Sequence, residues 1–484
     1  MLSYPPTPQV HSVEVLHGET ITDPYRWLEN GESAETQRWT QSQNAFTEAY
    51  LARVPGRERI RARLAQLLSI GVLGVPVPAR GRYFYLRRDG AQNQPVLYWR
   101  MGVAGEDRIA IDPNELNRAG TTALDWFYPS QDGSLLAYGL SEDGSEQSVL
   151  HLLEVETGRQ LDDRIPHTRA ASLAWRPDAS GFYYTRYPAP GKVPAGEEHY
   201  HRAVFYHRLG SDPASDDLIY QPKEKEFWPG VSLSPDGRWL VISVARTFDE
   251  TDLYLADLSS GGTPVPVVEG LPATFDGEVA HGWLYIRTNL DAPTYRLYQA
   301  SPEQPARSTW REIVRPRTDA VLEGFTMSRS HLALSYLEGA SARLRLTDLK
   351  GAEEREVELP ALGSLFGVHA EPEGSEVLYG FSSYTVPPSV YRIDPAVSGS
   401  ELWRRVESEV DPGKYRVEQV SYRSRDGTPI SMFVVHGTGV DLNGNNPTYL
   451  TGYGGFNISM TPAFSRSLLL WVERGGVLAV PNIR

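Results

Sequence analysis

Between about residues 75 and 400, the chain repeats one pattern, a turn followed by a strand in which apolar and polar positions alternate. A second apolar strand follows each turn after roughly 15 to 25 residues, which leaves room for four short antiparallel strands per unit. The turn landmarks are Gly81, Gly133, Gly181, Gly237, Gly282, Ser330 and Gly374. Seven units of about 44 to 56 residues predict a seven-bladed β-propeller, whereas a pair of β-sandwiches would not explain the even spacing.

The repeated turns carry their own local chemistry. Three of the turns have similar sequences, and each predicts a glycine with positive φ at its last position: 130–133, 234–237 and 371–374. The aspartates that recur in such turns are interpreted as side-chain caps rather than catalytic acids: Asp132, Asp178 and Asp236.

Outside the repeat, the N-terminal flank reads as an extended lead followed by helices. Within 35–53, Trp39, Phe46 and Tyr50 share one helical face, and a second apolar face follows in 57–68. These apolar stripes have to pack against something outside the propeller ring.

The C-terminal flank changes pattern again. Alternation over 416–422 and 430–435 predicts a hairpin, and 448–450 is a short strand that runs into a glycine turn. A helix is predicted within 462–474 and a buried strand from Val477 to Val480, an order typical of an α/β layer. Because a parallel sheet that stopped there would have an open edge, we expect this α/β domain to be incomplete in the sequence.

The composition of the chain bears on its binding partners and on its location in the cell. The formal net charge is −14 and no basic run is present, so neither nucleic acid nor a membrane surface is an expected partner. There are no cysteines, which excludes disulfides and thiol chemistry. No signal peptide is evident at the N-terminus, and we expect a cytoplasmic protein.

Most residue types that carry chemistry form no recognisable site. The sequence has no Gly-x-Ser-x-Gly elbow, P-loop, dinucleotide fingerprint or His-Glu-x-x-His motif. His199 and His201 could offer two imidazoles to a metal, but an exposed pair in a loop is the preferred interpretation. No metal and no cofactor are expected.

The glycine-rich stretch 451–457 is the most informative short motif. It lies after a strand and before a helix, where α/β-hydrolases place a loop that supplies part of the oxyanion hole. The Tyr453 hydroxyl could donate to a developing oxyanion, and Phe456 could wall a small apolar pocket. The alternative is a glycine turn packed by aromatic residues, which the motif by itself favours.

Several stretches resemble the prolyl oligopeptidase family of serine peptidases. Asp23-Pro24-Tyr25-Arg26-Trp27-Leu28-Glu29 is similar to its N-terminal signature, and 453–459 with 475–484 is similar to the start of its hydrolase domain. The resemblance covers about residues 4–484. It implies a propeller inserted in an α/β-hydrolase domain, and cleavage of short peptides on the carboxyl side of proline by a serine, histidine and aspartate.

The resemblance also assigns residues. It makes Tyr453 the side-chain oxyanion donor and Phe456 a wall of the proline pocket, and it matches Tyr183, Trp228 and Phe248 to an outer substrate pocket. Family members can carry a different aromatic residue, a methionine and a cysteine at these places, so the present set is bulkier. The family's nucleophile motif and triad come after the point that Arg484 matches, so this chain alone is predicted to be inactive.

The sequence therefore predicts three parts: an N-terminal helical segment of the hydrolase domain (1–70), a seven-bladed propeller (71–410) and the start of the α/β-hydrolase core (411–484). Its predicted partners are short proline-containing peptides, and the complete enzyme is expected to be a monomer. Two alternatives stay open: a non-catalytic propeller that binds peptides or proteins, and a sister oligopeptidase with another specificity.

Overall fold

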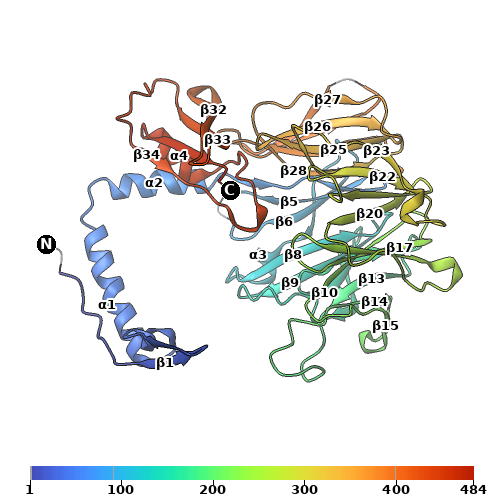
Figure 1. Cartoon of the computed structure of the whole chain (residues 1–484), viewed down its shortest axis with the longest axis horizontal. Helices are drawn as coiled ribbons and strands as arrows, with labels where there is room; N and C mark the ends of the chain where they lie inside the picture. The colour runs from blue at the N-terminus through green and yellow to red at the C-terminus, as the bar shows by residue number, and fades with distance from the viewer. Residues whose placement is uncertain (1–2, 91, 398, 484) are drawn as a thin grey trace. The chain divides into compact units, whose positions relative to one another are not determined.

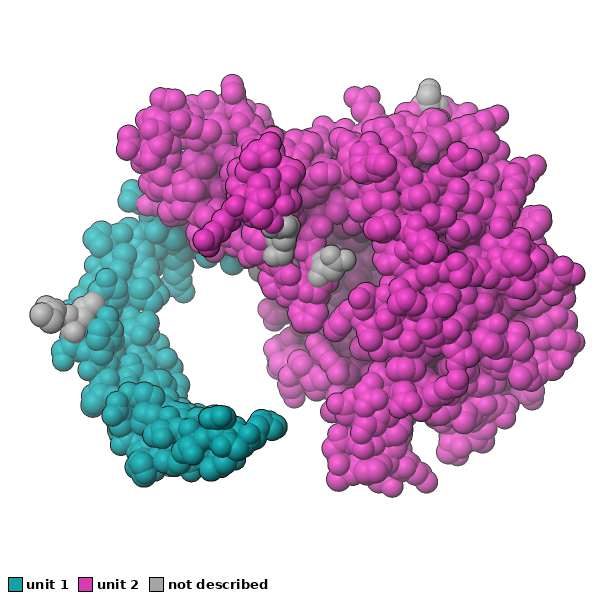
Figure 2. Space-filling view, viewed as in Figure 1, with its two compact units in different colours: residues 1–68 teal, residues 69–484 magenta. Residues whose placement is uncertain are grey.

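The computed structural model describes residues 3–90, 92–397 and 399–483, and the chain divides into two compact units. Figure 2 colours them separately: unit 1 is residues 1–68 and unit 2 is residues 69–484.

Unit 1 begins with a hairpin that the sequence interpretation missed. Strands β1 (Val13–Leu16) and β2 (Glu19–Thr22) pair antiparallel across His17 and Gly18, both of which have positive φ, as a two-residue hairpin turn requires. The short helix η1 (Arg26–Glu29) follows.

Two α-helices complete unit 1, close to the predicted ranges: α1 (Ala34–Leu51), capped by the Ser33 hydroxyl, and α2 (Arg57–Leu68). The N-terminal lead covers part of the aromatic stripe on α1. The Tyr4 ring lies 5.2 Å from the Phe46 ring, and Trp39 donates to the Thr7 hydroxyl. Among the described residues of this unit only Thr36 and Leu67 are buried, so unit 1 has little core of its own.

Unit 2 confirms the propeller. Seven antiparallel sheets follow one another along the chain, each made only of consecutive strands (Figure 1). Blade 1 has five strands, because β4 pairs with β5 beside β3, and each of the other blades has four. A short helix, α3 (Pro113–Leu116), joins blades 1 and 2, and the 3-10 turns η2 (Pro213–Ser215), η3 (Leu258–Ser260) and η4 (Arg307–Thr309) precede outer strands.

The strands of blades 1 to 4 have the following bounds: β3 Val72–Leu73, β4 Val77–Ala79, β5 Arg82–Arg88, β6 Val96–Met101 and β7 Arg108–Ile111; β8 Thr122–Pro129, β9 Leu135–Glu142, β10 Val149–Glu154 and β11 Arg159–Ile165; β12 Leu173–Trp175, β13 Gly181–Arg186, β14 Ala203–Arg208 and β15 Asp217–Tyr220; β16 Trp228–Leu233, β17 Trp239–Ala245, β18 Thr251–Asp257 and β19 Val265–Val268. Those of blades 5 to 7 are β20 Phe275–Ala280, β21 Trp283–Thr288, β22 Arg296–Ala300 and β23 Arg311–Val314; β24 Val321–Met327, β25 His331–Glu338, β26 Ser341–Asp348 and β27 Arg355–Val357; β28 Ser364–Ala370, β29 Val377–Ser382, β30 Ser389–Ile393 and β31 Glu401–Arg405.

The core lies between neighbouring blades rather than inside any one of them. Between blades 4 and 5, for example, Leu253 packs with Phe275 and Leu284, and all three are fully buried. Because both faces of each sheet meet a neighbour, the middle strands bury residues on both sides, which explains runs such as Val377–Ser382.

The turn predictions are partly right. Gly133 and Gly237 have positive φ, as expected, but Gly374 does not, and its amide closes a plain turn on the Glu371 carbonyl. At Gly181 the glycine serves another purpose: a Cβ there would lie 2.3 Å from the His207 carbonyl, and Ala179 takes the positive φ instead. The cap interpretation is confirmed by three backbone amides that donate to aspartate side chains: Ser134 to Asp132, Ser180 to Asp178 and Arg238 to Asp236.

Among the described strands, no sheet combines blade 1 with blade 7, so contacts outside the sheets close the ring. In Figure 1 the orange strand β28 lies beside the light-blue strands of blade 1, and Tyr85, Val96, Leu378 and Val390 share one buried cluster there. The Arg80 amide also donates to Glu371 across the seam, at 2.5 Å.

One carboxylate gathers several of the polar contacts at this seam. Asp107 of blade 1 accepts hydrogen bonds from Tyr85, Arg100 and Arg87, the last at 2.6 Å, and from Arg404 of blade 7 at 2.7 Å. Its side chain is only 16% exposed. Burial alone would raise the pKa of Asp107, but the bonds from the tyrosine and the arginines lower it well below its usual range.

A buried histidine joins blades 2 and 3. His207 has no exposed side-chain surface, and its two ring nitrogens lie 2.9 Å from Asp163 and 2.8 Å from Asp216, whose second oxygen accepts from Tyr184. Burial opposes the charged ring, but the two carboxylates outweigh it and raise the pKa of His207. Both nitrogens can donate only when the ring is protonated.

We therefore expect the stability of unit 2 to fall at alkaline pH. The contribution of His207 is fully present below the unfolded pKa of about 6.5 and is lost as the pH rises through the raised folded pKa. His207→Gln should lower the urea midpoint more at pH 6 than at pH 9. The matched control is His281→Gln, whose ring faces only the Ser328 carbonyl. An equal loss for His207→Gln at both pH values would contradict the charged ring.

The C-terminal part of unit 2 is a mixed sheet with the strand order β32 (Tyr415–Arg423), β33 (Pro429–Gly437), β35 (Val477–Pro481) and β34 (Thr448–Leu450), preceded by η5 (Pro412–Lys414). Strands β34 and β35 are parallel and are connected through helix α4 (Arg466–Glu473), which confirms the predicted α/β layer. The helix begins later than predicted, at a Ser465 cap.

Blade 7 contacts this sheet through a buried tyrosine. Tyr384, from the loop between β29 and β30, enters the core formed by Phe433, Val435 and Leu478, and its ring lies 5.7 Å from Phe433. The Tyr384 hydroxyl is buried without a hydrogen-bond partner in the part of the chain that the structure describes. The contact is therefore one of packing.

Tyr384→Ala should loosen the C-terminal sheet, at a cost of about 3–5 kcal/mol for a buried aromatic ring. Hydrogen exchange should accelerate at the amides of β33 and β35. Tyr384→Phe keeps the ring and removes only an unpaired hydroxyl, so its exchange should match the parent chain. Faster exchange in both variants would show that the hydroxyl, not the ring, makes the attachment.

Candidate functional site

The glycine loop 451–458 forms the centre of the candidate site. It leaves β34 and contains the one-turn helix η6 (Gly455–Asn457), inside which Phe456 has positive φ (54°). The Tyr453 hydroxyl lies over Gly455, where a Cβ would come within 2.8 Å of it. Glycine at 455 therefore lets the tyrosine fold over its own loop, and both aromatic side chains remain largely exposed.

Asn482, just after β35, supports this loop. Its side chain accepts from the Met460 amide at 2.7 Å and donates to the Met460 carbonyl at 3.2 Å, while its own amide bonds the Ser431 carbonyl of β33. Two strands of the sheet thus fix the chain just after the aromatic residues. Sequence reasoning did not assign Asn482 this role, since only its place after a buried strand could have suggested it.

The propeller contributes Phe248, at the tip of the loop between β17 and β18. Its ring lies 5.1 Å from the Phe456 ring at an interplanar angle of 58°, although 87% of Phe248 and 65% of Phe456 is exposed. An exposed aromatic pair of this kind offers apolar surface to a further ring or aliphatic group. The structure thus brings together two of the residues that the family resemblance assigned.

Trp228 stands at the same end of blade 4. It is the first residue of β16, the innermost strand, and pairs in register with Ala245, three residues before Phe248. Trp228 is 48% exposed, and the buried Arg202 guanidinium lies 4.9 Å from the centre of its ring. One face of the indole is thus covered by the protein.

Tyr183 does not belong with these residues. It is only 6% exposed and packs between blades 3 and 4, with its ring 5.0 Å from Tyr206. The expected role for Tyr183 in an outer pocket is therefore not supported, because its alternating position on a middle strand turns it into the inter-blade core. Burial raises the pKa of its hydroxyl.

The topology explains why the site lies at one end of the ring. In an antiparallel blade, the connection from the second to the third strand and the connection to the next blade fall on the same face. Phe248, Trp228 and Tyr384 all lie at such connections. The C-terminal sheet contacts this face again where Gln419 donates to the Gly339 carbonyl and where the Phe464 amide donates to Ser382.

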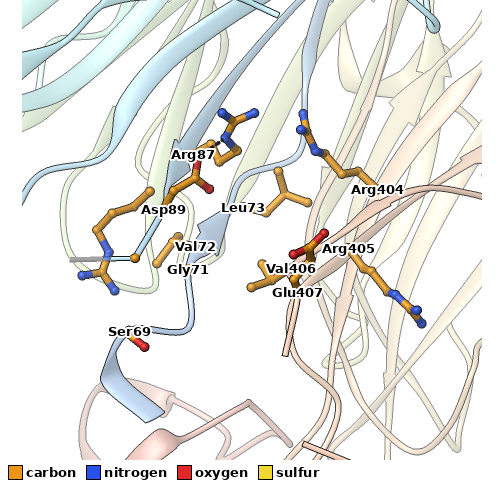
Figure 3. A pocket seen from close by; sticks show the side chains of 12 residues that line it. Ser69, Gly71, Val72, Leu73, Arg87, Asp89, Arg404, Arg405, Val406 and Glu407 are labelled. Carbon is orange, nitrogen blue, oxygen red and sulfur yellow. Dashed lines mark hydrogen bonds and ion pairs between the residues drawn. The ribbon is translucent and has the colours of Figure 1, made fainter. Parts of the chain in front are cut away.

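The two chain crossings between the propeller and its flanks lie side by side. They line a pocket of about 490 Å³ between 69–73 and 404–407, with Arg87 and Asp89 at its edge (Figure 3). Gly71 is required here, because a Cβ would lie 2.4 Å from the Arg88 carbonyl. Arg466 of α4 donates to the carbonyls of Ile70 and Gly71 and so ties the C-terminal sheet to the first crossing.

No group of acidic and histidine side chains suited to a metal ion occurs among the residues that the structure describes. His201 instead faces Glu197, at 2.7 Å, and Glu197 also accepts from Lys225. None of the described helices is both long enough and apolar enough to cross a membrane.

Comparison with known proteins agrees with this architecture. Residues 5–406 match the family model for the N-terminal β-propeller domain of prolyl oligopeptidase. The chain is 33% identical over 489 residues to a prolyl endopeptidase of Elizabethkingia meningoseptica, and the match covers 100% of this chain and 68% of that protein. A prolyl endopeptidase of Elizabethkingia miricola is 32% identical, with the same coverage.

Solved structures give the same result. The chain superposes on one from a study of two prolyl endopeptidases with a TM-score of 0.92 and 35% identity, over 100% of this chain and 71% of that one. Prolyl oligopeptidase B of Galerina marginata, bound to a 35-residue substrate, has a TM-score of 0.90 at 24% identity, over 99% of this chain and 72% of that one, and supports the fold alone.

Proposed function

Because the chain belongs to the prolyl oligopeptidase family, we propose that it provides the β-propeller and the first part of the α/β-hydrolase domain of a serine endopeptidase. The enzyme would cleave short peptides on the carboxyl side of proline. In this proposal, segments 1–70 and 411–484 belong to the hydrolase domain and 71–410 is the inserted propeller. The nucleophile, histidine and aspartate come from hydrolase residues outside these 484.

The contact between Phe248 and Phe456 carries the proposal. It puts the loop that bears Tyr453 against the rim of the propeller, so that a peptide reaching Tyr453 also meets propeller residues. Tyr453 would donate to the oxyanion as the scissile carbonyl is attacked, Phe456 would wall the proline pocket, and Phe248 with Trp228 would line the outer pocket. The ring admits flexible peptides more readily than folded proteins.

The edge of the C-terminal sheet supports the same proposal. In the described chain, β34 pairs only with β35, and Tyr449 and Leu450 are 48% and 67% exposed. A parallel pair with an uncovered edge is unusual, because parallel strands are normally buried on both faces. Further strands and helices of a hydrolase core would cover it.

The test uses the complete polypeptide that the gene encodes. It should release the reporter from a Gly-Pro amide at least 100 times faster than from a Gly-Arg amide, and a serine-directed fluorophosphonate should abolish this activity. A preference for the arginine reporter would favour a sister oligopeptidase. Binding of a proline-containing octapeptide without turnover would favour a non-catalytic propeller.

A further inference from the structure

Arg202 is a buried charge without a counter-ion. The residue is 3% exposed, and among the described residues no carboxylate lies within 4.0 Å of its guanidinium. Burial lowers the pKa of Arg202 to about 10, which still leaves it positively charged at neutral pH. Buried charges are normally paired, so an unpaired one calls for an explanation.

The hydrogen bonds of Arg202 fix it to blade 3. One terminal nitrogen donates to the Ala170 carbonyl at 2.7 Å and to the Thr185 hydroxyl at 2.5 Å. Thr185 lies near the end of β13, and Ala170 lies in the connection that enters the blade. Nε and the second terminal nitrogen are buried without a partner in the described structure.

The guanidinium of Arg202 lies over the Trp228 ring of blade 4. Its central carbon is 4.9 Å from the centre of the Trp228 ring and 5.8 Å from that of Tyr187. Attraction between a cation and an aromatic ring is strongest for tryptophan and grows when the cation is desolvated, as it is here. Trp228 in turn keeps about half of its surface exposed.

We propose that Arg202 is a positioning residue, which holds Trp228 in one orientation and so presents a preformed aromatic wall to the peptide residues that precede the proline. This inference rests on the proposed function in one respect only, the contact between Trp228 and substrate. The charged guanidinium attracts the indole and donates to the Ala170 carbonyl at the same time. Preorganisation lowers the entropy lost when the peptide binds.

The orientation of Trp228 can be measured without substrate. The chain has 11 tryptophans, and 5-fluorotryptophan labelling gives each a fluorine resonance, with Trp228 assigned by its loss in Trp228→Phe. In Arg202→Met, the Trp228 line should broaden at least twofold or split. Trp283, which is 44% exposed, is the matched control and should not move. The other resonances report whether the variant has folded.

Two further variants complete the test: one tests the charge at residue 202, and the other is a control at a different cation–aromatic pair. Arg202→Lys keeps a cation at pH 6 and should keep a single Trp228 line there, but it should lose that line as the buried lysine deprotonates at higher pH. Arg238→Met is the second control, because Arg238 stacks on Trp239 at 4.5 Å, outside the site, and should leave Trp228 unchanged. If Arg202→Met leaves the Trp228 line sharp, the inference is wrong.

The consequence for substrate is measured in the complete enzyme. Arg202→Met should raise KM about fivefold for an octapeptide with residues before the proline, with kcat within twofold, and should leave a minimal proline reporter unaffected. An equal loss for both substrates would overturn the inference in favour of a general structural role. If Trp228→Ala leaves the octapeptide KM unchanged, the proposed outer pocket fails, while the fluorine spectra still decide the role of Arg202.

Discussion

Asp107→Asn is expected to destabilise unit 2 by about 3 kcal/mol, because it removes one partner of a largely buried ion cluster. The carboxylate is mostly buried and is shared by Arg87, Arg100 and Arg404. Its removal leaves three cations close together and partly desolvated. Since the ring has no shared closing sheet, side chains have to supply this part of the seam.

The control for this prediction is Glu156→Gln. Glu156 also bridges two arginines, Arg82 at 2.9 Å and Arg108 at 3.3 Å, but its side chain is 47% exposed. An exposed bridge should cost less than about 1 kcal/mol. Urea unfolding of both variants at pH 7 measures the difference. Similar midpoints for the two would show that Asp107 has no special part in closing the ring.

Tyr453→Phe should lower kcat of the complete enzyme by about 100-fold and leave KM within threefold, the usual result of losing one oxyanion donor. The hydroxyl would bond the oxygen only as negative charge develops, so it stabilises the transition state rather than the bound peptide. Initial rates with a proline reporter amide over a range of concentrations separate the two parameters.

Tyr449→Phe provides the matched comparison, because Tyr449 is 48% exposed and lies only four residues before Tyr453. Its ring lies 6.4 Å from Trp471, away from the glycine loop. We expect kcat for Tyr449→Phe to equal that of the parent enzyme. If Tyr453→Phe retains a third or more of the parent kcat, another group donates to the oxyanion.

The fold could be predicted from the sequence because the propeller repeats one pattern of strands and turns seven times. Each blade has to bury two faces, which imposes regular alternation and regular turns. The way the ring closes could not be predicted in the same manner. Arg404 and Asp107 are 297 residues apart, and nothing near either of them in the chain indicates the other.

The candidate site was predictable only in part. Phe456 was found from the glycine-rich motif and Phe248 through the family resemblance, but their contact could not be inferred from spacing. Tyr183 was assigned by the same resemblance, yet its middle strand is buried on both faces and takes it into the core. The sequence did not indicate a role for Arg202, because an arginine at the end of a polar loop is usually solvated. Only its burial in the structure indicates one.

In the proposed enzyme, the glycine loop of this chain contacts the proline of a peptide substrate. The most direct measurement is photo-crosslinking of the complete polypeptide with a peptide whose single proline carries a diazirine, followed by mapping of the labelled residues by mass spectrometry. We expect labelling within 451–458. A control peptide that carries the diazirine on a side chain the size of alanine should not label this segment. Labelling confined to the propeller would contradict it.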